Sequence, residues 1–302
     1  MAEEYHNPVL KEEVINGLNL EGKQLFVDGT LGGAGLNRFN SLKEIAFDRD
    51  IEAINYSKDR LKNYLDRVEL LNCNFREITN YLKQKKLKAD GILLDLGVSS
   101  HQIDDSERGF SFRFTGPLDM RMNREQSLSA YEVVNNYDET KLANIIYEYG
   151  EERLSRQIAK AIVNSRPLKT TEELKTIVES VVSRYNKREV KSSVQRVFQA
   201  IRIEVNGELE GLYDFILSLA DVTAEGGRIA IITFHSLEDR IVKRAFNELC
   251  TGCVCPPNLP ICVCGHKPVA KFVNKKPITA TEEELKDNTR ASSAKLRVIE
   301  IL

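Results

Sequence analysis

A glycine-rich turn follows a short apolar run near the N-terminus, in Val27-Asp28-Gly29-Thr30-Leu31-Gly32-Gly33-Ala34-Gly35. Glycines let the backbone approach a ligand closely, although such a loop alone also fits an ordinary tight turn. Asp48 ends the next apolar run, 20 residues after Asp28, where its carboxylate could accept hydrogen bonds from ribose hydroxyls. The loop does not match the spaced G-x-G-x-x-G dinucleotide fingerprint, so the pattern favours S-adenosylmethionine over a nicotinamide dinucleotide.

A second acid, Asp95, ends the fourth apolar run in Asp95-Leu96-Gly97-Val98-Ser99-Ser100, with Gln102 shortly after. An acid at the carboxyl end of a central strand points into the crevice where doubly wound sheets bind ligands. A helix cap is an equally good interpretation of this residue alone. Phe75 follows the third run and could stack on an adenine, although a single Phe more often belongs to the core.

A lone histidine lies in Phe234-His235-Ser236-Leu237-Glu238-Asp239-Arg240, where a strand pattern gives way to a helix pattern. Ser236 is the predicted N-cap, with Glu238 and Asp239 in the first helical turn. His235 is therefore placed at the ligand-facing end of the strand, although a lone His is more often structural than catalytic. No serine lies in a nucleophile elbow, so the sequence gives no support to a hydrolase.

Basic and aromatic residues interleave in the middle of the chain. One helical face carries Gln195, Gln199, Arg202 and Asn206, and such a face is normally only solvated. It lies opposite a predicted apolar stripe made of Val194, Val197, Phe198, Ile201 and Val205. It adjoins a dense basic run made of Arg184, Lys187, Arg188 and Lys191. An earlier segment interleaves arginines with Phe110, Phe112 and Phe114, and these arginines are Arg108, Arg113, Arg121 and Arg124. This mixture suits phosphate contacts and base stacking, so we predict an RNA-binding role, with Arg108, Arg202 and Asn206 as candidate substrate contacts.

Five of the six cysteines lie between Cys250 and Cys264, followed by His266. Clustering of this kind is unlike a disulfide framework and indicates a reducing environment. Four suitably placed ligands from this set could hold a structural zinc ion, and a reduced surface loop fits the pattern equally well. The two Cys-x-Cys pairs are less diagnostic than paired Cys-x2-Cys knuckles, so the sequence assigns no metal here.

The elements that position these residues follow from periodicity. Predicted strands at residues 25–27, 45–47, 68–71 and 91–96 alternate with helical patterns, as in a parallel sheet with crossover helices. Residues 107–206 then show helical periodicity, and Thr170 with Glu173 has the spacing of a capping box. The α/β pattern resumes with a helix at 212–219, a strand at 228–234, a helix at 238–249 and a strand at 296–301. The sequence predicts a doubly wound α/β domain interrupted by a helical insertion.

Composition bounds the class of protein. The chain has 302 residues, 42% of them hydrophobic, with 43 Lys and Arg against 45 Asp and Glu. No apolar run approaches the roughly 20 residues of a membrane-spanning helix, and the acidic N-terminus is unlike a signal peptide. We therefore expect a cytoplasmic protein. The near-neutral total conceals two basic stretches, residues 184–202 with six basic residues and one acid, and residues 251–281 with four lysines and no acid.

Several motifs together closely resemble the bacterial ribosomal RNA small subunit methyltransferase H family. The resemblance spans nearly the whole chain and rests on these segments: His6-Asn7-Pro8-Val9-Leu10, Asp95-Leu96-Gly97-Val98-Ser99-Ser100, Glu107-Arg108-Gly109-Phe110-Ser111-Phe112, Gly116-Pro117-Leu118-Asp119-Met120-Arg121-Met122, Phe198-Gln199-Ala200-Ile201-Arg202-Ile203-Glu204-Val205-Asn206, Phe234-His235-Ser236-Leu237-Glu238-Asp239-Arg240 and Asn288-Thr289-Arg290-Ala291-Ser292-Ser293-Ala294-Lys295-Leu296-Arg297.

The resemblance implies a class I methyltransferase domain at residues 1–106 and 207–302, with an inserted helical domain at 107–206 that contacts RNA. It implies methylation of N4 of a cytosine in the decoding region of small-subunit rRNA, either naked or in the assembled small ribosomal subunit, with S-adenosylmethionine as the methyl donor. The implied cofactor positions are Ala34, Gly35, Leu36, Asp48, Phe75, Asp95 and Gln102. Because the lone pair of N4 is delocalised into the ring, an acceptor for an N4 proton would help, and Asp95 is the predicted catalytic group, with His235 as its partner or proton acceptor.

Two departures from the family keep other functions open. Ala34-Gly35-Leu36 stands where the family has Gly-Gly-His, and only 13 residues, Gly32 to Glu44, separate the first turn from the second strand. A short first helix presents its N–H groups less rigidly, so we predict reduced or lost cofactor affinity. The alternative is a noncatalytic RNA-binding or ribosome-assembly factor. A DNA amino methyltransferase is disfavoured because the chain has no Asp-Pro-Pro-Tyr type motif.

Overall fold

The chain divides into two compact units. The structure is a computed structural model that describes residues 8–31, 41–253, 255, 264–265 and 267–302. The helical unit is Val98–Glu208, and the sheet unit combines Asn7–Gly97 with Leu209–Leu302. The sequence predicts an insertion at 107–206, so the helical unit begins nine residues before the predicted start and ends two residues after the predicted end. None of the described helices is both long and apolar enough to cross a membrane.

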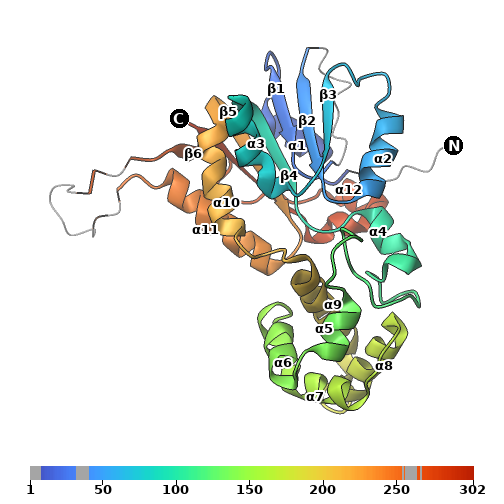
Figure 1. Cartoon of the computed structure of the whole chain (residues 1–302). Coiled ribbons are helices and arrows are strands. Elements are labelled where there is room, and N and C mark those ends of the chain that lie inside the picture. The colour runs from blue at the N-terminus through green and yellow to red at the C-terminus, as the bar shows by residue number, and fades with distance from the viewer. Residues whose placement is uncertain (1–7, 32–40, 254, 256–263, 266) are drawn as a thin grey trace. The chain divides into compact units, whose positions relative to one another are not determined.

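Seven strands form the sheet, in the order β3-β2-β1-β4-β5-β7-β6 (Figure 1). The first five strands are parallel, while β7 is antiparallel to β5 and β6 is antiparallel to β7. Near-continuous apolar runs such as Ile92-Leu93-Leu94 suit this arrangement, because a parallel sheet is covered on both faces. The bounds are β1 Leu25–Asp28, β2 Lys43–Asp48, β3 Val68–Asn72, β4 Ala89–Asp95, β5 Thr223–Thr233, β6 Ala270–Phe272 and β7 Lys295–Ile301.

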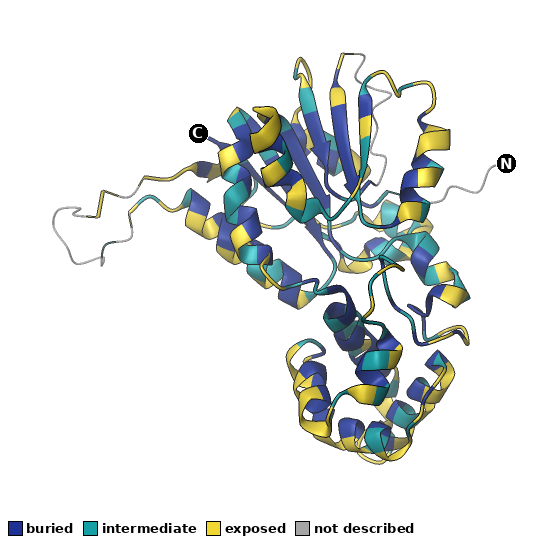
Figure 2. Cartoon of the chain, in the orientation of Figure 1, coloured by how far each residue is buried: buried dark blue, intermediate teal, exposed yellow. Residues whose placement is uncertain are grey.

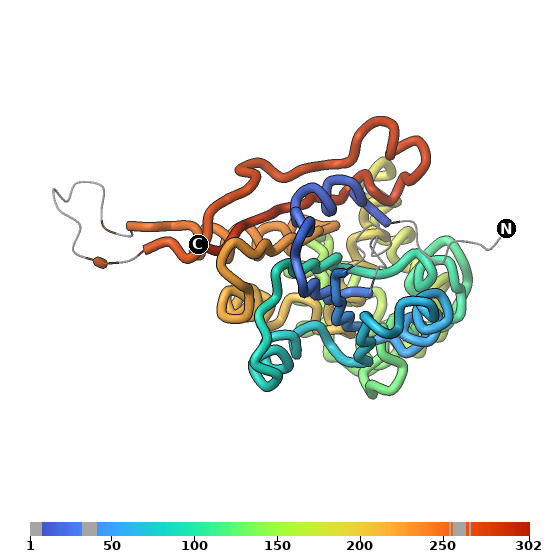
Figure 3. The backbone as a smooth tube through the Cα atoms, turned by 90° about the horizontal axis from the view of Figure 1, so that it is seen from above, coloured from blue at the N-terminus to red at the C-terminus, as the bar shows by residue number. Residues whose placement is uncertain are grey.

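Helices cover both faces of this sheet. One face packs against α3, α10 and α11 through side chains such as Leu82, Ile216 and Phe246, all fully buried. The other face packs against α1, which contacts β5 and β7 and lies beside the C-terminal strand although the two are far apart in sequence (Figure 3). The bounds are α1 Lys11–Leu18, α2 Ile51–Arg60, α3 Ile78–Lys85, α10 Leu212–Leu219, α11 Ser236–Cys250 and α12 Glu282–Asp287.

The helical unit has its own core, built around α9. Val197, Phe198 and Ile201 on α9 are buried against the other helices, as the predicted apolar stripe requires (Figure 2). The predicted capping box is confirmed, because Thr170 and Glu173 exchange both of its hydrogen bonds at the start of α8. The bounds are α4 Ser100–Asp104, α5 Ala130–Asn136, α6 Glu139–Glu148, α7 Ser155–Asn164, α8 Thr171–Val182 and α9 Val190–Asn206.

The doubly wound α/β fold with a helical insertion is confirmed, with three local corrections. The strand β5 begins at Thr223 rather than at 228, because Thr223 already pairs with Ala89 of β4, ahead of an irregularity in which Gly226 adopts a φ of +70°. The edge strand β6 was not predicted, since three residues carry no periodicity. His235, not Ser236, is the N-cap of α11, so Ser236 is already the first helical residue. The predicted short helix after the glycine-rich turn lies outside the described residues.

Candidate active site

Three acids stand at one edge of the sheet, at the carboxyl ends of adjacent parallel strands. Asp28 ends β1, Asp48 ends β2 and Asp95 ends β4, and the strand order places these three strands side by side. The carboxyl edge of a parallel sheet is where doubly wound proteins bind their ligands. The fold therefore brings together two predicted site residues, Asp48 and Asp95, with an acid that the sequence analysis treated only as part of the loop.

Thr30 connects two of these acids. Its amide donates to Asp28 Oδ1 at 3.0 Å, and its hydroxyl lies 3.4 Å from the same oxygen. The Thr30 hydroxyl also accepts a hydrogen bond from the Asp95 amide at 2.8 Å. The end of β1 is thereby fixed to the end of β4, so Asp28 and Thr30 position the backbone that carries Asp95. Sequence reasoning missed Thr30, although a threonine two residues after an acid is a recognised turn signal.

Gly29 permits the turn after β1 to pack closely against Leu94 of β4 and against Phe75. A Cβ at this position would lie 2.3 Å from Leu94 Cδ2 and 3.2 Å from Phe75 Cβ, closer than a side chain allows. Glycine is therefore required here for packing within the sheet unit, between the turn and the segment that follows β3. Packing therefore explains Gly29, whereas the other glycines of the turn can still serve to bind a ligand.

Asp48 accepts backbone hydrogen bonds in a buried setting. Its Oδ1 accepts from the Asp50 amide at 2.7 Å, and Asp50 in turn caps α2 by accepting from the Glu52 amide at 3.0 Å. Burial raises the pKa of Asp48 to about 7, although the hydrogen bond from the Asp50 amide partly opposes this, and the negative charges of Asp50 and Asp28 add to it. This carboxyl group therefore changes its charge near neutral pH.

Glu44 on β2 is a buried acid that the sequence analysis did not single out. Glu44 is 2% exposed, and neither of its carboxylate oxygens has a hydrogen-bond partner in the part of the chain that the structure describes. Burial, together with the nearby charge of Asp28, holds the pKa of Glu44 well above its ordinary value. The alternation of the strand gave no signal for this buried acid.

Phe75 follows β3 and opens a short 3-10 helix, Phe75–Glu77. Its ring packs against Phe215 of α10, with 5.3 Å between centroids and an interplanar angle of 50°. The residue is only partly buried, so it belongs to the margin of the core. This position near the Gly29 turn is compatible with stacking of a flat ring on its remaining surface.

Asp95 continues into Leu96 and Gly97, which run beside the end of β5. The Leu96 amide donates to the Ile232 carbonyl at 3.0 Å, and Asp95 lies opposite Ile232 in the sheet register. Gly97 has a φ of +107°, and a Cβ there would touch the ring of Phe234 at 3.4 Å. A left-handed glycine thus lets the chain turn directly after the acid.

His235 follows Phe234, and its ring lies against Glu238, with a hydrogen bond at Nδ1 but none at Nε2 among the described residues. Its Nδ1 accepts from the Glu238 amide at 3.4 Å, and its Nε2 lies 3.2 Å from Glu238 Oε1. Its side chain is 7% exposed, and Glu238 also accepts from the Phe234 amide at 2.9 Å. These contacts fix the junction of β5 and α11, and they give His235 a structural role as a helix cap.

The other four predicted cofactor residues lie outside the described part of the sheet unit. Ala34, Gly35 and Leu36 lie outside the described residues. Gln102 belongs to the helical unit, on α4, where its side-chain oxygen accepts from the Ser99 amide at 3.1 Å and completes a capping box. Of the seven predicted cofactor positions, the sheet edge therefore displays Asp48, Phe75 and Asp95.

The predicted RNA contacts have partners within the helical unit. The Arg108 guanidinium, 1% exposed, donates to the carbonyl oxygens of Arg121 and Met122 at 3.0 and 3.1 Å. The Asn206 amide donates to the Met120 carbonyl at 2.8 Å and accepts from the Met122 amide at 2.9 Å. Arg202 pairs with both oxygens of Glu208, at 2.9 and 2.8 Å. These three residues hold the segment around Met120–Met122 and the end of α9.

One group of exposed cations in this unit lies between the end of α8 and the first turn of α9. The side chains of Arg184, Lys187, Arg188 and Lys191 are exposed, and Tyr185 among them is 63% exposed. We call these five residues the basic turn. Exposed cations around an exposed aromatic ring suit phosphate contacts and base stacking.

The side chains at the sheet edge fit S-adenosylmethionine by their chemistry. The cofactor carries a sulfonium, an ammonium group and ribose hydroxyls, which are all positive or hydrogen-bond donating. The sheet edge offers acceptors, because Asp48 and Asp95 are carboxylates at neighbouring strand ends, with the partly exposed Phe75 ring beside the Gly29 turn. The group therefore matches the residues present.

Comparison with known proteins identifies the family. The family model described as the MraW methylase family matches residues 3–302. Ribosomal RNA small subunit methyltransferase H from Brevibacillus brevis is 46% identical, covering 99% of this chain and 98% of that protein. The protein of the same name from Clostridium botulinum (strain Kyoto) is 48% identical, covering 97% of each.

A solved structure, a putative SAM-dependent methyltransferase from Streptococcus mutans, matches with a TM-score of 0.42 and 9% identity, covering 97% of this chain and 48% of that one. The class I methyltransferase fold expected from the sequence is confirmed by the family match and the order of the strands. The chain belongs to the MraW methylase family.

Proposed function

We propose that the protein transfers a methyl group from S-adenosylmethionine to N4 of a cytosine in the decoding region of small-subunit rRNA. The observation that supports this most directly is that Asp48 and Asp95 end β2 and β4, the two strands on either side of β1, at the carboxyl edge of a methyltransferase sheet. The similar proteins from Brevibacillus and Clostridium, whose names state an rRNA substrate, support the choice of RNA.

In this proposal the sheet edge holds the cofactor. Asp48 accepts hydrogen bonds from the ribose hydroxyls, Phe75 stacks on the adenine, and Ala34, Gly35, Leu36 and Gln102 complete the site. When bound, the cofactor supplies a methyl group on a sulfonium, which is already a strong electrophile. The protein therefore has to orient the two reactants rather than activate the methyl group.

Asp95 is the proposed catalytic residue. Cytosine N4 is a weak nucleophile because its lone pair is shared with the ring. A carboxylate that accepts a hydrogen bond from an N4 proton makes that lone pair more available. Asp95 suits this role because Thr30 and the Leu96 amide fix its backbone at the ligand edge. The contacts of His235 with Glu238 support a positioning role for it at the end of β5, rather than proton transfer.

The helical unit is the proposed RNA contact, through the basic turn. The target base has to leave its stack before it can reach an active site, and contacts to the flanking phosphates help to hold the opened strand. Arg108, Arg202 and Asn206 take part indirectly in this proposal, because their hydrogen bonds shape the segment around Met120–Met122.

The decisive experiment is mass spectrometry of small-subunit rRNA from cells that lack the protein. We expect one cytosine to lose a methyl group and to regain it when the wild-type gene is restored. Restoration with Asp95→Asn should leave the base unmodified. An rRNA that is unchanged by the deletion would instead support a noncatalytic assembly factor. Assays with naked rRNA and with assembled small subunits then identify the form that is methylated.

A calorimetric titration with S-adenosylmethionine tests the altered loop separately. The substitution of Gly-Gly-His by Ala34-Gly35-Leu36, with the short crossover, predicts weaker binding than in other family members. Replacing Leu36 by His should then strengthen binding. Ordinary micromolar affinity in the unaltered chain, with no gain from Leu36→His, would remove this part of the proposal.

A further inference from the structure

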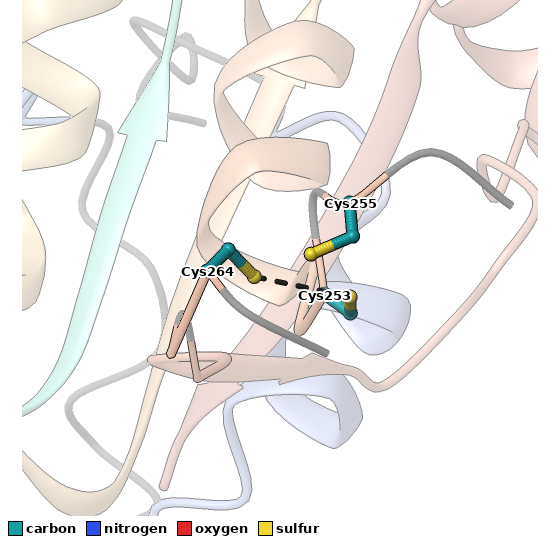
Figure 4. Close-up of side chains that lie close together, drawn as sticks. All are labelled: Cys253, Cys255 and Cys264. Atoms are coloured by element: carbon teal, nitrogen blue, oxygen red, sulfur yellow. Dashed lines mark hydrogen bonds between the residues drawn. The ribbon is translucent and has the colours of Figure 1, made fainter. Parts of the chain in front are cut away.

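Three cysteine side chains meet in the segment that joins α11 to β6. The two ends of this segment are fixed next to the sheet, because the Val269 amide donates to the Leu249 carbonyl at 2.8 Å and the Leu302 amide donates to the Val269 carbonyl at 3.0 Å. Beyond these hydrogen bonds, Cys253 and Cys255 come from the outgoing chain and Cys264 from the returning chain (Figure 4). We call these three residues the thiol cluster.

The spacing of the sulfur atoms matches a tetrahedral metal site. The three Sγ atoms all lie within 4.8 Å of one another, and those of Cys253 and Cys264 are 3.8 Å apart. With zinc–sulfur bonds of about 2.3 Å, two ligands of a tetrahedral zinc ion stand about 3.8 Å apart. A disulfide requires about 2.05 Å, and none of the described cysteines forms one.

The thiol cluster is not part of a hydrophobic core. Cys253 and Cys264 are exposed, whereas cysteines that serve packing are among the most buried residues in proteins. Cys250 provides the contrast within the same segment, because it packs against the core of the sheet unit, and burial raises the pKa of its thiol to about 11. Exposed thiols that converge from two chain segments need a reason other than packing.

The charge of the segment suits an anionic metal site. Residues 251–281 contain Lys267, Lys271, Lys275 and Lys276 and no acidic residue. A zinc ion bound by three or four thiolates carries a net negative charge that lysines offset. Zinc also prefers sulfur ligands over the carboxylates that hold magnesium or calcium, and the thiol cluster contains no carboxylate.

We propose that Cys253, Cys255 and Cys264 bind one structural zinc ion, which joins the outgoing and returning parts of this segment. Binding releases the three thiol protons to solvent, so that each sulfur donates an electron pair as a thiolate. The described residues supply three of the four ligands of a tetrahedral site. The zinc site is independent of the methyl-transfer site, so the two proposals are tested separately.

Metal analysis of the full-length protein, purified under reducing conditions from zinc-supplemented cells, tests the proposal. We expect about one zinc ion per chain, and a tetrahedral thiolate spectrum when cobalt replaces the zinc. The double variant Cys253→Ser/Cys264→Ser should lose both signals. The matched controls Cys73→Ser and Cys250→Ser should keep them, since these two thiols lie outside the thiol cluster.

Several results would overturn the zinc site. These are a wild-type protein without zinc, full zinc content in the double variant, or iron and sulfide in place of zinc. A disulfide between Cys253 and Cys264 in the protein as isolated under reducing conditions would do the same. Circular dichroism and S-adenosylmethionine titration of the double variant check that the sheet unit remains folded, so that loss of zinc cannot be attributed to unfolding.

Discussion

Acids of the helical unit and the acid at the end of β2 have different partners. In the helical unit, burial raises the pKa of Glu152, yet the Leu154 amide and the Arg196 guanidinium more than offset this and hold it below its ordinary value. Asp119 behaves in the same way, because hydrogen bonds from Arg121 outweigh its burial. At the end of β2 in the sheet unit, burial dominates instead and raises the pKa of Asp48 to about 7, whereas Arg297 holds the pKa of Asp239 in the same unit below its ordinary value.

This difference distinguishes acids whose charge is compensated within the protein from acids whose charge a ligand can compensate. An arginine next to a buried carboxylate satisfies its charge within the protein. Asp48 receives a backbone amide in place of a guanidinium hydrogen bond, so its charge is stabilised less. A cationic ligand with several hydroxyl groups would supply positive charge and hydrogen-bond donors to Asp48 at the sheet edge, and S-adenosylmethionine is such a ligand. The following predictions test this contrast.

The largest effect is expected from Asp95→Asn. Replacing the carboxylate by a neutral amide weakens the acceptor for an N4 proton and should lower the methylation rate about 100-fold or more, while the fold is retained. The measurement is transfer of labelled methyl groups to rRNA at saturating cofactor. Asp90→Asn is the matched control, since Asp90 lies on the same strand at the opposite end, where it accepts from the Gln24 and Leu25 amides at 3.0 Å. A full rate for Asp95→Asn, with normal cofactor binding, would refute the catalytic role.

The next effect concerns stability in the helical unit. Arg196→Met leaves Glu152 buried without its guanidinium, which donates to Glu152 Oε2 from two nitrogens, at 2.9 and 2.5 Å. We expect a loss of about 2 kcal/mol at pH 7, measured by denaturant unfolding of the full chain. Because the folded pKa of Glu152 is lowered, its contribution is present at neutral pH and is lost as the pH falls through that pKa. The gap between variant and wild type should therefore close in acid.

An exposed ion pair supplies the control for this experiment. Lys175 lies 3.2 Å from Glu172 on α8, with both side chains partly exposed. Lys175→Met should cost no more than about 0.5 kcal/mol, because solvent screens such pairs. Equal losses from the two variants would mean that burial of the carboxylate does not matter here, and the contrast between the two units would fail.

Local periodicity explains how much of the fold could be predicted. The helix at residues 212–219 was predicted with the bounds it has, and the apolar stripe of α9 is buried as expected. Both features repeat over several turns, so single residues do not decide them. The cap of α11 depended instead on the backbone angles of one residue, which is why His235 rather than Ser236 occupies it.

The site was only partly predictable because its contacts join distant parts of the sequence. Strand ends indicated Asp48 and Asp95, since a strand followed by an acid is a local pattern. The partner of Asn206 is the segment around Met120–Met122, more than 80 residues away, and no spacing rule indicates such a pair. Glu44 was missed for the opposite reason, because a charged residue in a strand is normally placed on the exposed face.

A smaller effect is expected in the pH dependence of cofactor binding. Asp48 has to be ionised to accept hydrogen bonds from ribose hydroxyls, and its pKa is raised to about 7. The affinity for S-adenosylmethionine should therefore rise about tenfold between pH 6 and pH 8. Asp48→Asn should bind about tenfold more weakly than wild type at pH 8 and show no such rise.

The control for this titration is Asp66→Asn, an exposed acid just before β3, which should keep the wild-type pH profile. Stability provides a second readout of the same group. Because the folded pKa of Asp48 lies above the unfolded value, its contribution to the free energy of unfolding is greatest in acid and is lost as the pH rises toward 7. A flat binding profile in the wild type would show that Asp48 does not titrate in this range.

The smallest effect is expected from single cations of the basic turn, because exposed charges act additively through screened interactions. Arg188→Ala should weaken binding to rRNA roughly threefold at moderate salt, and it should lower the slope of log affinity against log salt by about one. Methylation at saturating rRNA should be unchanged, since Arg188 lies in the helical unit and not at the strand ends. Lys160→Ala on α7 removes the same charge from an exposed position of the same unit. An equal loss from Lys160→Ala would mean that rRNA senses only the net charge of the helical unit, whereas a loss confined to Arg188 assigns the contact to the basic turn.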